Sequence, residues 1–440
     1  MTDRPNAVPV PGPQPLPPAR LQQLVDELRD ADRRNRAAVN LVPSETRLSP
    51  LAALPLATDF YNRYFFDEHS GFRGGLAAHR LESEVAAGSL ARLSGARHVN
   101  TRPVSGMSAM TLAIAALAGP RGNTVISVGD EHGGHYATRE VVEHLGYRSA
   151  TVAFRSGRVD RDDLVRALRE GTPGLVYLDL QHSLHLPDVA AVVETVRRHG
   201  RGVPVHVDCS HTLGLVLGGA VPHPLEAGAD SMGGSTHKTF PGPHKGVLIT
   251  DRPDVAERFH EADMRLISSH HFAESLSLGL AAAEFEHFGA GYAAATLANA
   301  ELLAESLHEE GFEVAKAGET FTRTHQVWVR IGDPEDTQRF FDRVTAVGLR
   351  VNRLSRLPGW DGPMIRLGTN EVTFEGAGPR SIRLIAAALG HARRAAPGRG
   401  PDAPEIRASF GRPHFFDDPA HLDPDAVFDP VTAFAAAGRG

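Results

Sequence analysis

The feature that most restricts the fold of this 440-residue chain is a series of short apolar runs separated by helical patterns. The apolar runs, bounded by glycine or proline, cover 124–128, 175–180, 205–207 and 246–250, and helical spacing marks 21–38, 81–94, 108–117 and 273–312. Short buried strands that alternate with helices are typical of a mostly parallel sheet covered by helices on both faces. The sequence therefore predicts an α/β fold.

The length exceeds that of one ordinary hydrophobic core, so a large and a small domain are expected. Residues 1–19 contain seven prolines and little periodicity, which is typical of a disordered arm. The predicted order is a disordered Pro-rich arm (1–19), an N-terminal segment (20–60), a large domain (61–290), a smaller C-terminal α+β domain (291–395) and a linker and tail (396–440).

Composition excludes several classes of function. The formal net charge of -7 provides no basic surface for nucleic acid or an anionic membrane. No apolar run is long enough to cross a bilayer. The single cysteine, Cys209, excludes an internal disulfide and agrees with a reducing cytoplasm. The 23 histidines and Cys209 show no zinc-site spacing, so no metal is expected.

One lysine occupies an unusual position. Lys238 lies in the glycine-flanked segment 233–243 between two predicted strands, and the chain contains only two other lysines among 46 basic residues. Lysine can lose its proton and form an imine when it is desolvated, whereas arginine can do neither. Lys238 is therefore a candidate nucleophile, and an ordinary surface lysine is the alternative.

Other polar residues follow predicted strands or open a helix, where open α/β sheets bind ligands. Ser105 and Gly106 open a helix and could bind a phosphate, or act only as a cap. His135 could stack on a flat ring, or be a polar loop residue. Asp208 could hold a proton on a heterocyclic nitrogen, or cap a helix. Arg366 could bind a carboxylate through two nitrogens, or be a surface arginine.

The order of these motifs resembles that of the serine hydroxymethyltransferase family of fold-type I pyridoxal 5'-phosphate enzymes. The resemblance covers about residues 35–390 and includes Leu-Val-Pro-Ser-Glu (41–45), Arg-Gly-Gly (73–75), Ser-Gly (105–106), His-Gly-Gly-His (132–135), Asp-Cys-Ser-His (208–211), Ser-Thr-His-Lys-Thr (235–239) and Arg-Leu-Gly-Thr (366–369). Residues 268–271 (Ser-Ser-His-His) resemble an archaeal-type variant. The resemblance implies a large domain with a mostly parallel, seven-stranded sheet and a smaller C-terminal α+β domain.

The resemblance also implies a role for each matching residue around pyridoxal 5'-phosphate. Lys238 would bond covalently to the cofactor aldehyde, Asp208 would keep the pyridine nitrogen protonated, His135 would stack on the ring, and His211 would lie near the phenolic oxygen. The remaining cofactor contacts are expected from Ser105, Gly106 and Met107 at the phosphate, from Thr236 and His237 beside the lysine, and from Gln181, where the family usually has serine.

Substrate binding and assembly follow from the same resemblance. Arg366, helped by Ser44, would bind the amino acid carboxylate. The family is dimeric, and the resemblance implies a homodimer with shared active sites. Tyr64 would enter the active site across the interface, and Ser269 and His270 would reach the phosphate of the partner subunit.

Three departures affect the family's folate pocket. Phe66 occupies the position of a glutamate that serves proton transfer, although Asp67 or Glu68 could still reach the site. Arg73 replaces an aromatic residue and Tyr136 replaces a leucine. Tetrahydrofolate binding is therefore not expected.

The predicted reaction is aldol-type cleavage of an L-threonine-like β-hydroxy amino acid and transfer of its glycyl unit to an acceptor aldehyde. Folate-independent relatives in biosynthetic pathways use such chemistry, with a nucleoside 5'-aldehyde or a small halogenated aldehyde as acceptor. The alternatives are a folate-dependent serine hydroxymethyltransferase, another fold-type I enzyme such as an aminotransferase, and an inactive cofactor-binding protein.

Overall fold

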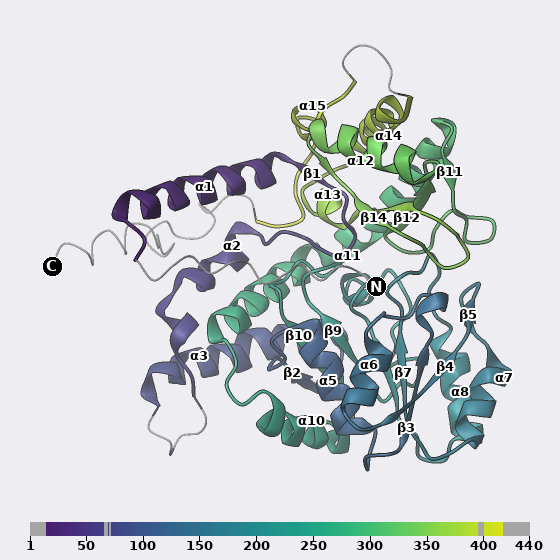
Figure 1. The fold of residues 1–440 in the computed structure, drawn as a ribbon. Coiled ribbons are helices and arrows are strands. Elements are labelled where there is room, and N and C mark those ends of the chain that lie inside the picture. The colour runs from purple at the N-terminus through teal and green to yellow at the C-terminus, as the bar shows by residue number, and fades with distance from the viewer. Residues whose placement is uncertain (1–14, 66–68, 70–71, 395–399, 417–440) are drawn as a thin grey trace.

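The computed structural model describes residues 15–65, 69, 72–394 and 400–416 (Figure 1). Its larger part is built on a seven-stranded sheet of order β2-β10-β9-β8-β7-β3-β4. The strands are β2 (His98–Asn100), β3 (Thr124–Val128), β4 (Arg148–Val152), β7 (Pro173–Asp179), β8 (Val205–Asp208), β9 (Ser231–Ser235) and β10 (Gly246–Thr250). Within this sheet β10 runs antiparallel to both of its neighbours, and the other pairs are parallel. The predicted mostly parallel, seven-stranded sheet is confirmed.

Helices cover both faces of this sheet because its strands are apolar on both sides. On β7, Val176 and Leu178 join one core, whereas Leu175 and Tyr177 join the other. The first core includes residues from α7 (Arg161–Arg169), α8 (Val189–His199), α9 (Leu213–Leu217) and α11 (Phe272–Glu309). The second includes residues from α5 (Gly106–Leu117), α6 (Thr138–His144) and α10 (Pro253–Leu266). The sheet is therefore a buried layer between two helical layers.

The smaller part contains a four-stranded antiparallel sheet of order β11-β12-β15-β14. These strands are β11 (Glu313–Val314), β12 (Gln326–Arg330), β14 (Asn352–Leu354) and β15 (Met364–Gly368), and their core includes residues from α12 (Pro334–Ala346) and α14 (Pro379–Arg394). The N-terminal segment returns to this part, because β1 (Val39–Asn40) pairs with β13 (Leu349–Arg350). The predicted α+β architecture of the C-terminal region agrees with this arrangement.

Part of the predicted tail packs on the smaller part. Helix α15 (Ala403–Arg407) buries Ile406 in that core, and Arg407 forms an ion pair with Glu375 at 2.9 Å. Residues 395–399 and 417–440 lie outside the described residues. The sequence interpretation of 396–440 as linker and tail did not include this packed helix.

Helix α11 spans 38 residues and belongs to both parts. Its first half places Leu278 and Phe285 in the core under the large sheet, and its second half places Leu303 and Leu307 in the core of the smaller part. The predicted boundary between residues 290 and 291 falls inside this helix. The two parts therefore share one continuous element.

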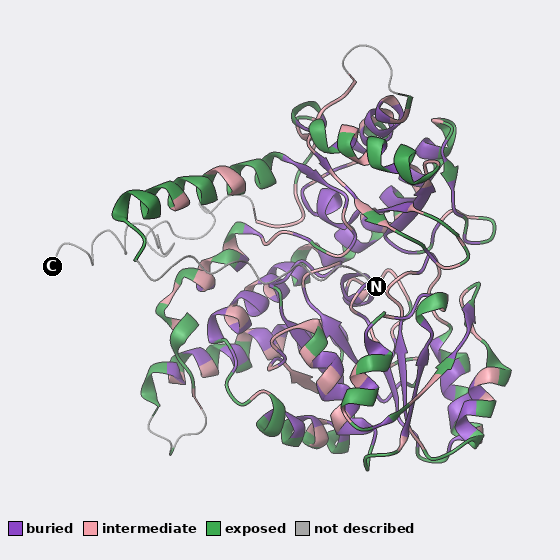
Figure 2. Cartoon of the chain, in the orientation of Figure 1, coloured by how far each residue is buried: buried purple, intermediate pink, exposed green. Residues whose placement is uncertain are grey.

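Helix α1 (Pro18–Ala37) extends beyond the rest of the protein and contains no buried residue (Figures 1 and 2). Its apolar side chains Leu21, Val25 and Leu28 are 50%, 41% and 70% exposed. The helix begins three residues earlier than predicted, at Pro18, whose missing N–H costs nothing in the first turn. Residues 1–14 of the predicted arm lie outside the described residues.

The remaining elements are short: α2 (Pro50–Ala53), α3 (Leu76–Leu81), the π-helical turn η4 (Glu82–Ala87), α4 (Gly88–Ser94), β5 (Phe154–Arg155), β6 (Arg158–Val159), α13 (Asn370–Phe374) and the 3-10 helices η1 (Leu54–Ala57), η2 (Asp59–Asn62), η3 (Arg73–Gly75) and η5 (Asp130–His132). The predicted helix over 81–94 corresponds to η4 and α4. Within the described ranges, none of the helices combines the length and apolar character needed to cross a membrane.

Candidate active site

A cavity of about 180 Å³ lies at the carboxyl ends of β7, β8 and β9, beside the first turn of α5. Nine residues predicted from the sequence line it: Ser105, Gly106, Met107, His135, Gln181, Asp208, His211, His237 and Lys238. The other lining residues are Met110, Asp179, Leu180, Ser210, Ser235 and His244. Segments from many parts of the chain therefore meet at the edge of the sheet where α/β folds bind ligands.

Lys238 lies in the loop that follows β9, and hydrogen bonds hold the backbone of this loop at Lys238 and at the residues before and after it. On the N-terminal side, the backbone N–H of Thr46 donates to the carbonyl of His237 at 2.8 Å. The hydroxyl of Thr46 donates to the carbonyl of Lys238 at 2.5 Å, and the hydroxyl of Tyr292 donates to the carbonyl of Thr239 at 2.9 Å. Burial lowers the pKa of Lys238 to about 8; nearby Asp208 opposes this effect and Arg366 adds to it. More of the neutral amine is then present near neutral pH, as a nucleophilic lysine requires.

Asp208 ends β8 and accepts hydrogen bonds on both carboxylate oxygens. Its Oδ1 accepts from the backbone N–H of Ser210 at 2.8 Å, and its Oδ2 accepts from the hydroxyl of Tyr177 at 2.5 Å. The Tyr177 ring is fully buried and stacks on His206, with 5.2 Å between ring centroids. The orientation of Asp208 is therefore set by β7 as well as by its own strand.

His135 is held by a second buried carboxylate. Its backbone N–H donates to Asp179 Oδ2 at 3.1 Å, and the Thr138 hydroxyl donates to the same oxygen at 2.5 Å. Burial raises the pKa of Asp179 to about 7, and the charge of Asp208 adds to this rise. Burial also lowers the pKa of His135, so its ring is a neutral, flat surface at the cavity. Tyr136 is 71% exposed and stacks on that ring at 4.6 Å.

The first turn of α5 borders one end of the cavity. Ser105 is the N-cap, and it forms reciprocal hydrogen bonds with Ser108. A Cβ at Gly106 would lie 2.0 Å from Ser235 Oγ, so any larger residue here would displace the Ser235 hydroxyl from the cavity wall. His237 stacks on His244 with 4.0 Å between ring centroids, and His237 Nδ1 has no partner in the described protein. Free N–H groups at a helix start favour a phosphate.

Arg366 is 3% exposed on β15 and its guanidinium is held in one orientation. Its Nε donates to Asn352 Oδ1 at 3.0 Å, and its Nη1 contacts His182 Nδ1 at 2.8 Å. Burial, with the charge of Arg366 adding to it, lowers the pKa of His182 to about 3, so this nitrogen acts as a neutral acceptor. A fixed guanidinium can present its remaining N–H groups to a carboxylate.

Ser44 is half-buried next to the site but does not line the cavity. Its position is set by Pro43, whose carbonyl accepts from His325 Nε2 at 2.9 Å, and His325 stacks on His211 at 5.7 Å. Thr236 also lies outside the lining, because its hydroxyl donates to the carbonyl of Pro243 at 2.7 Å within the loop. That hydroxyl shapes the loop that carries Lys238.

The residues assigned to a subunit interface do not line the cavity of their own chain. Tyr64 is 42% exposed and its ring lies 4.7 Å from that of Phe72. Ser269 is exposed, whereas His270 is buried and contacts Glu82 at 2.7 Å. Of the folate-pocket positions, Arg73 is exposed in the described chain, and Phe66, Asp67 and Glu68 lie outside the described residues.

Sequence reasoning missed Tyr177, Asp179 and His182. A sequence signal for Tyr177 and Asp179 was present, because polar side chains alternate at these two positions of β7 and again at Gln181, two residues beyond the strand. Side chains two residues apart on a strand point to the same face. The pattern therefore marks the face of β7 that borders the cavity.

Comparisons with known proteins show the family and the fold of this chain. The family model described as "Serine hydroxymethyltransferase" matches residues 19–388. An L-threonine:uridine-5'-aldehyde transaldolase of Streptomyces sp is 49% identical over 402 residues, covering 90% of this chain and 98% of the relative. Another of the same name, from Amycolatopsis sp, is 48% identical over 407 residues, covering 91% and 98%.

A solved structure of an L-threonine transaldolase from Pseudomonas fluorescens has the same fold. It superimposes with a TM-score of 0.81 at 24% identity and covers 96% of this chain and 99% of that chain. At this identity the likeness concerns the fold alone.

Proposed function

Since this chain belongs to the serine hydroxymethyltransferase family, we propose that it is a pyridoxal 5'-phosphate-dependent L-threonine transaldolase. It would cleave the Cα–Cβ bond of L-threonine, release acetaldehyde and add the glycyl unit to a nucleoside 5'-aldehyde. The observation that carries this proposal is the 48–49% identity, over nearly their whole length, to relatives named L-threonine:uridine-5'-aldehyde transaldolase.

The described residues fit pyridoxal 5'-phosphate. Asp179 Oδ1, Gln181 Oε1, His211 Nδ1 and His237 Nδ1 are buried polar atoms without a partner in the described protein. Such atoms cost free energy unless a ligand or water bonds to them. A cofactor with an aldehyde, a ring nitrogen, a phenolic oxygen and a phosphate offers partners at the places where Lys238, Asp208, His211 and the start of α5 stand.

In the proposed reaction the protein residues bind and orient, and the cofactor supplies an electron sink for the carbanion formed at Cα. Lys238 provides the amine that holds the cofactor aldehyde. Asp208, fixed by Tyr177 and Ser210, would keep a proton on the ring nitrogen of the bound cofactor, and the His135 side chain would contact its ring. Arg366 binds the amino acid carboxylate and so fixes which bond at Cα is cleaved.

Two positions of the described chain support a transaldolase over a folate-dependent enzyme. Tyr136 stacks on His135 and occupies the position of a folate-pocket leucine, and Arg73 is an exposed cation where the family has an aromatic ring. At both positions the pterin ring of tetrahydrofolate would therefore lack an apolar side chain to pack against. A ribose and a base carry hydrogen-bonding groups that suit a tyrosine hydroxyl and a guanidinium.

The test measures acetaldehyde release from L-threonine by the cofactor-loaded enzyme with and without tetrahydrofolate. We expect equal rates, and a new amino acid product when uridine-5'-aldehyde is added. Lys238→Ala is the control for uncatalysed cleavage. Serine cleavage that saturates with tetrahydrofolate, without activity on threonine, would instead establish a serine hydroxymethyltransferase.

We also propose a cytoplasmic homodimer with shared active sites. The exposed apolar residues of α1, and the exposed positions of Tyr64 and Ser269 outside their own cavity, support an interface that covers them. The buried free thiol of Cys209 supports a reducing compartment.

Mixed dimers test the sharing of sites. A Lys238→Ala chain and a Tyr64→Phe chain, each weakly active alone, should regain activity when co-expressed, because one of the two sites then has both residues. Mixed dimers that are no more active than either parent would show that Tyr64 does not serve the partner's site.

A further inference from the structure

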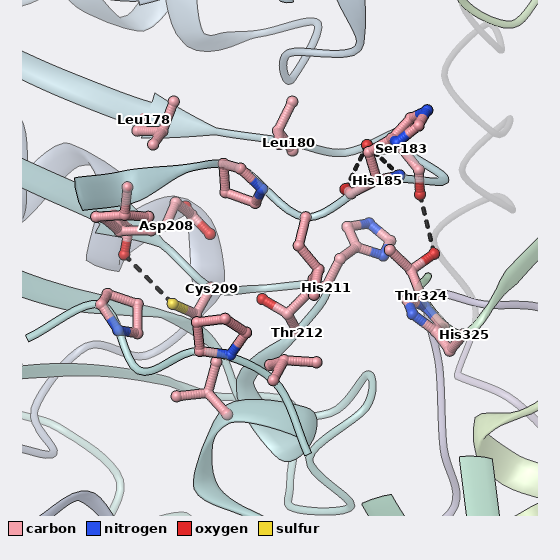
Figure 3. Close-up of a pocket in the computed structure, with 18 of the residues that line it drawn as sticks. Leu178, Leu180, Ser183, His185, Asp208, Cys209, His211, Thr212, Thr324 and His325 are labelled. Atoms are coloured by element: carbon pink, nitrogen blue, oxygen red, sulfur yellow. Dashed lines mark hydrogen bonds between the residues drawn. The ribbon is translucent and has the colours of Figure 1, made fainter. Parts of the chain in front are cut away.

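A second cavity, which we call the inner cavity, adjoins the active-site cavity, and its lining is drawn in Figure 3. It is bounded by Leu178 and Val207 of the sheet, which belong to the core on the α8 side. It shares three lining residues with the active-site cavity: Leu180, Asp208 and His211. The two spaces therefore adjoin each other at these three side chains.

The same cavity adjoins an open depression on the protein surface. Both are lined by His185, Pro187, Val189 and Pro222, and the depression measures about 800 Å³. Arg158 and Arg323 line its outer part. Active site, inner cavity and surface depression thus lie in series.

Size and chemistry restrict what the inner cavity can hold. Its volume is about 40 Å³, and one water-sized probe needs about 10–15 Å³, so it accommodates roughly three non-hydrogen atoms. Most of its walls are leucine, valine and proline side chains. An amino acid or a nucleoside is too large and too polar, whereas acetaldehyde has three non-hydrogen atoms and one oxygen.

Polar groups also border this cavity. Two of its ring nitrogens, Nδ1 of His211 and Nδ1 of His325, are buried without a hydrogen-bond partner in the described protein, and hydroxyl groups of Ser183, Thr212 and Thr324 belong to the lining. Mostly apolar pockets with a few placed polar groups are typical of sites for small, weakly polar molecules. Such a pocket can hold the oxygen of a small aldehyde at its polar side and the methyl group against the apolar wall.

We infer that this cavity is a binding site and exit route for the small aldehyde released from the amino acid, separate from the entrance used by the acceptor. The inference rests on the proposed transaldolase function. Cleavage at Cα–Cβ is reversible, so acetaldehyde that stays beside the reacting carbon re-forms threonine. Removal of acetaldehyde through the inner cavity leaves the space beside the reacting carbon free for the acceptor aldehyde.

Val221→Phe tests the inference by filling the cavity. Val221 is half-buried, follows α9 and lines the cavity, so a larger ring can be accommodated without disrupting the sheet. Leu225→Phe is the matched control, because Leu225 is also half-buried and packs on the same core but does not line the cavity. The assay is the incorporation of isotope-labelled acetaldehyde into threonine by the cofactor-loaded enzyme. Exchange of the glycine α-proton with D2O is the second readout, since it needs no aldehyde.

We expect Val221→Phe to reduce acetaldehyde incorporation on the order of tenfold, since passage of a product can limit an enzyme's rate, and to leave glycine proton exchange unchanged. Leu225→Phe should change neither. Unchanged incorporation in Val221→Phe, or an equal loss of both reactions, would overturn the inference.

Xenon binding separates this inference from the proposed function. Crystals of the loaded enzyme under xenon pressure should show an atom in the cavity, and Val221→Phe crystals should not. If wild-type crystals show no xenon in the inner cavity, the proposed exit route is overturned, whatever reaction the enzyme catalyses. Failure of the wild-type enzyme to release acetaldehyde from threonine overturns the proposed function, and with it acetaldehyde as the occupant.

Discussion

Replacing Asp179 by asparagine should stabilise the protein, and the gain should grow with pH. Asp179 is 2% exposed, and its Oδ1 has no partner in the described protein. Its pKa is about 7 in the fold, against 3.8 for the free side chain, because burial disfavours the charged carboxylate. Asparagine has the same shape, keeps an oxygen to accept from the His135 N–H and the Thr138 hydroxyl, and never ionises.

The direction of this pH dependence follows from the difference in bound protons between the folded and the unfolded chain. Between pH 3.8 and about 7 the unfolded chain releases this proton more readily than the folded one, so stability falls as pH rises. Each pH unit in that window costs about 1.4 kcal/mol, and the whole shift amounts to about 4 kcal/mol. Wild type and Asp179→Asn should therefore be similar in stability near pH 4 and differ most above pH 7.

Urea unfolding of cofactor-free protein from pH 5 to 9 measures this difference. We expect the free energy of unfolding of Asp179→Asn to exceed that of the wild type by an amount that rises up to pH 7 and then levels off. Asp179→Ala is the contrasting variant, since it leaves the His135 N–H without an acceptor and should destabilise by about 1–3 kcal/mol. If the difference in free energy of unfolding between the wild type and Asp179→Asn did not change with pH, the raised pKa of Asp179 would be refuted.

Three further substitutions test the active site. Lys238→Ala should abolish the covalent cofactor link, so that borohydride reduction followed by mass spectrometry finds no cofactor mass on the chain; retention of that mass would place the link elsewhere. Arg366→Lys keeps the charge but loses the planar guanidinium, so calorimetry should show glycine binding at least about tenfold weaker, or about 1.4 kcal/mol; unchanged affinity would move the carboxylate site. Tyr177→Phe removes the donor to Asp208 Oδ2 and should lower the free energy of unfolding by about 1.5–3 kcal/mol; no change would mean that this hydrogen bond contributes nothing.

The parts of the fold that could be predicted are those set by local pattern. Strands β3 and β10 have the predicted bounds, because each is a continuous apolar run between turn residues. Strand β9 continues further than the run before Gly233 indicated. A Cβ at Gly233 would lie 2.2 Å from the Val247 carbonyl, so the glycines belong to the sheet and allow two backbones to approach closely.

The active site could be predicted where a motif names the residue, and not where only packing does. Lys238 and Asp208 were predicted from their sequence context and line the cavity, whereas Arg366, predicted in the same way, does not line it, and its role stays a prediction. His182 is defined only by its contact with Arg366, 184 residues away. The position of α15 depends on Ile406 entering a core formed by distant segments. No local pattern carries such information.

Helix α11 also determines how this enzyme can be recombined with its relatives. A hybrid that exchanges everything after residue 290 would join two half-helices at the point where both cores depend on the same rotation about the helix axis. An insertion or deletion of one residue there turns the second half by about 100° and moves Leu303 and Leu307 out of their core. A workable junction lies beyond Glu309, and the exchanged piece must include the β1 segment, which pairs with β13 from the other end of the chain. The smaller part is therefore encoded by two separate stretches of sequence, and a gene fusion at a single point cannot transfer it.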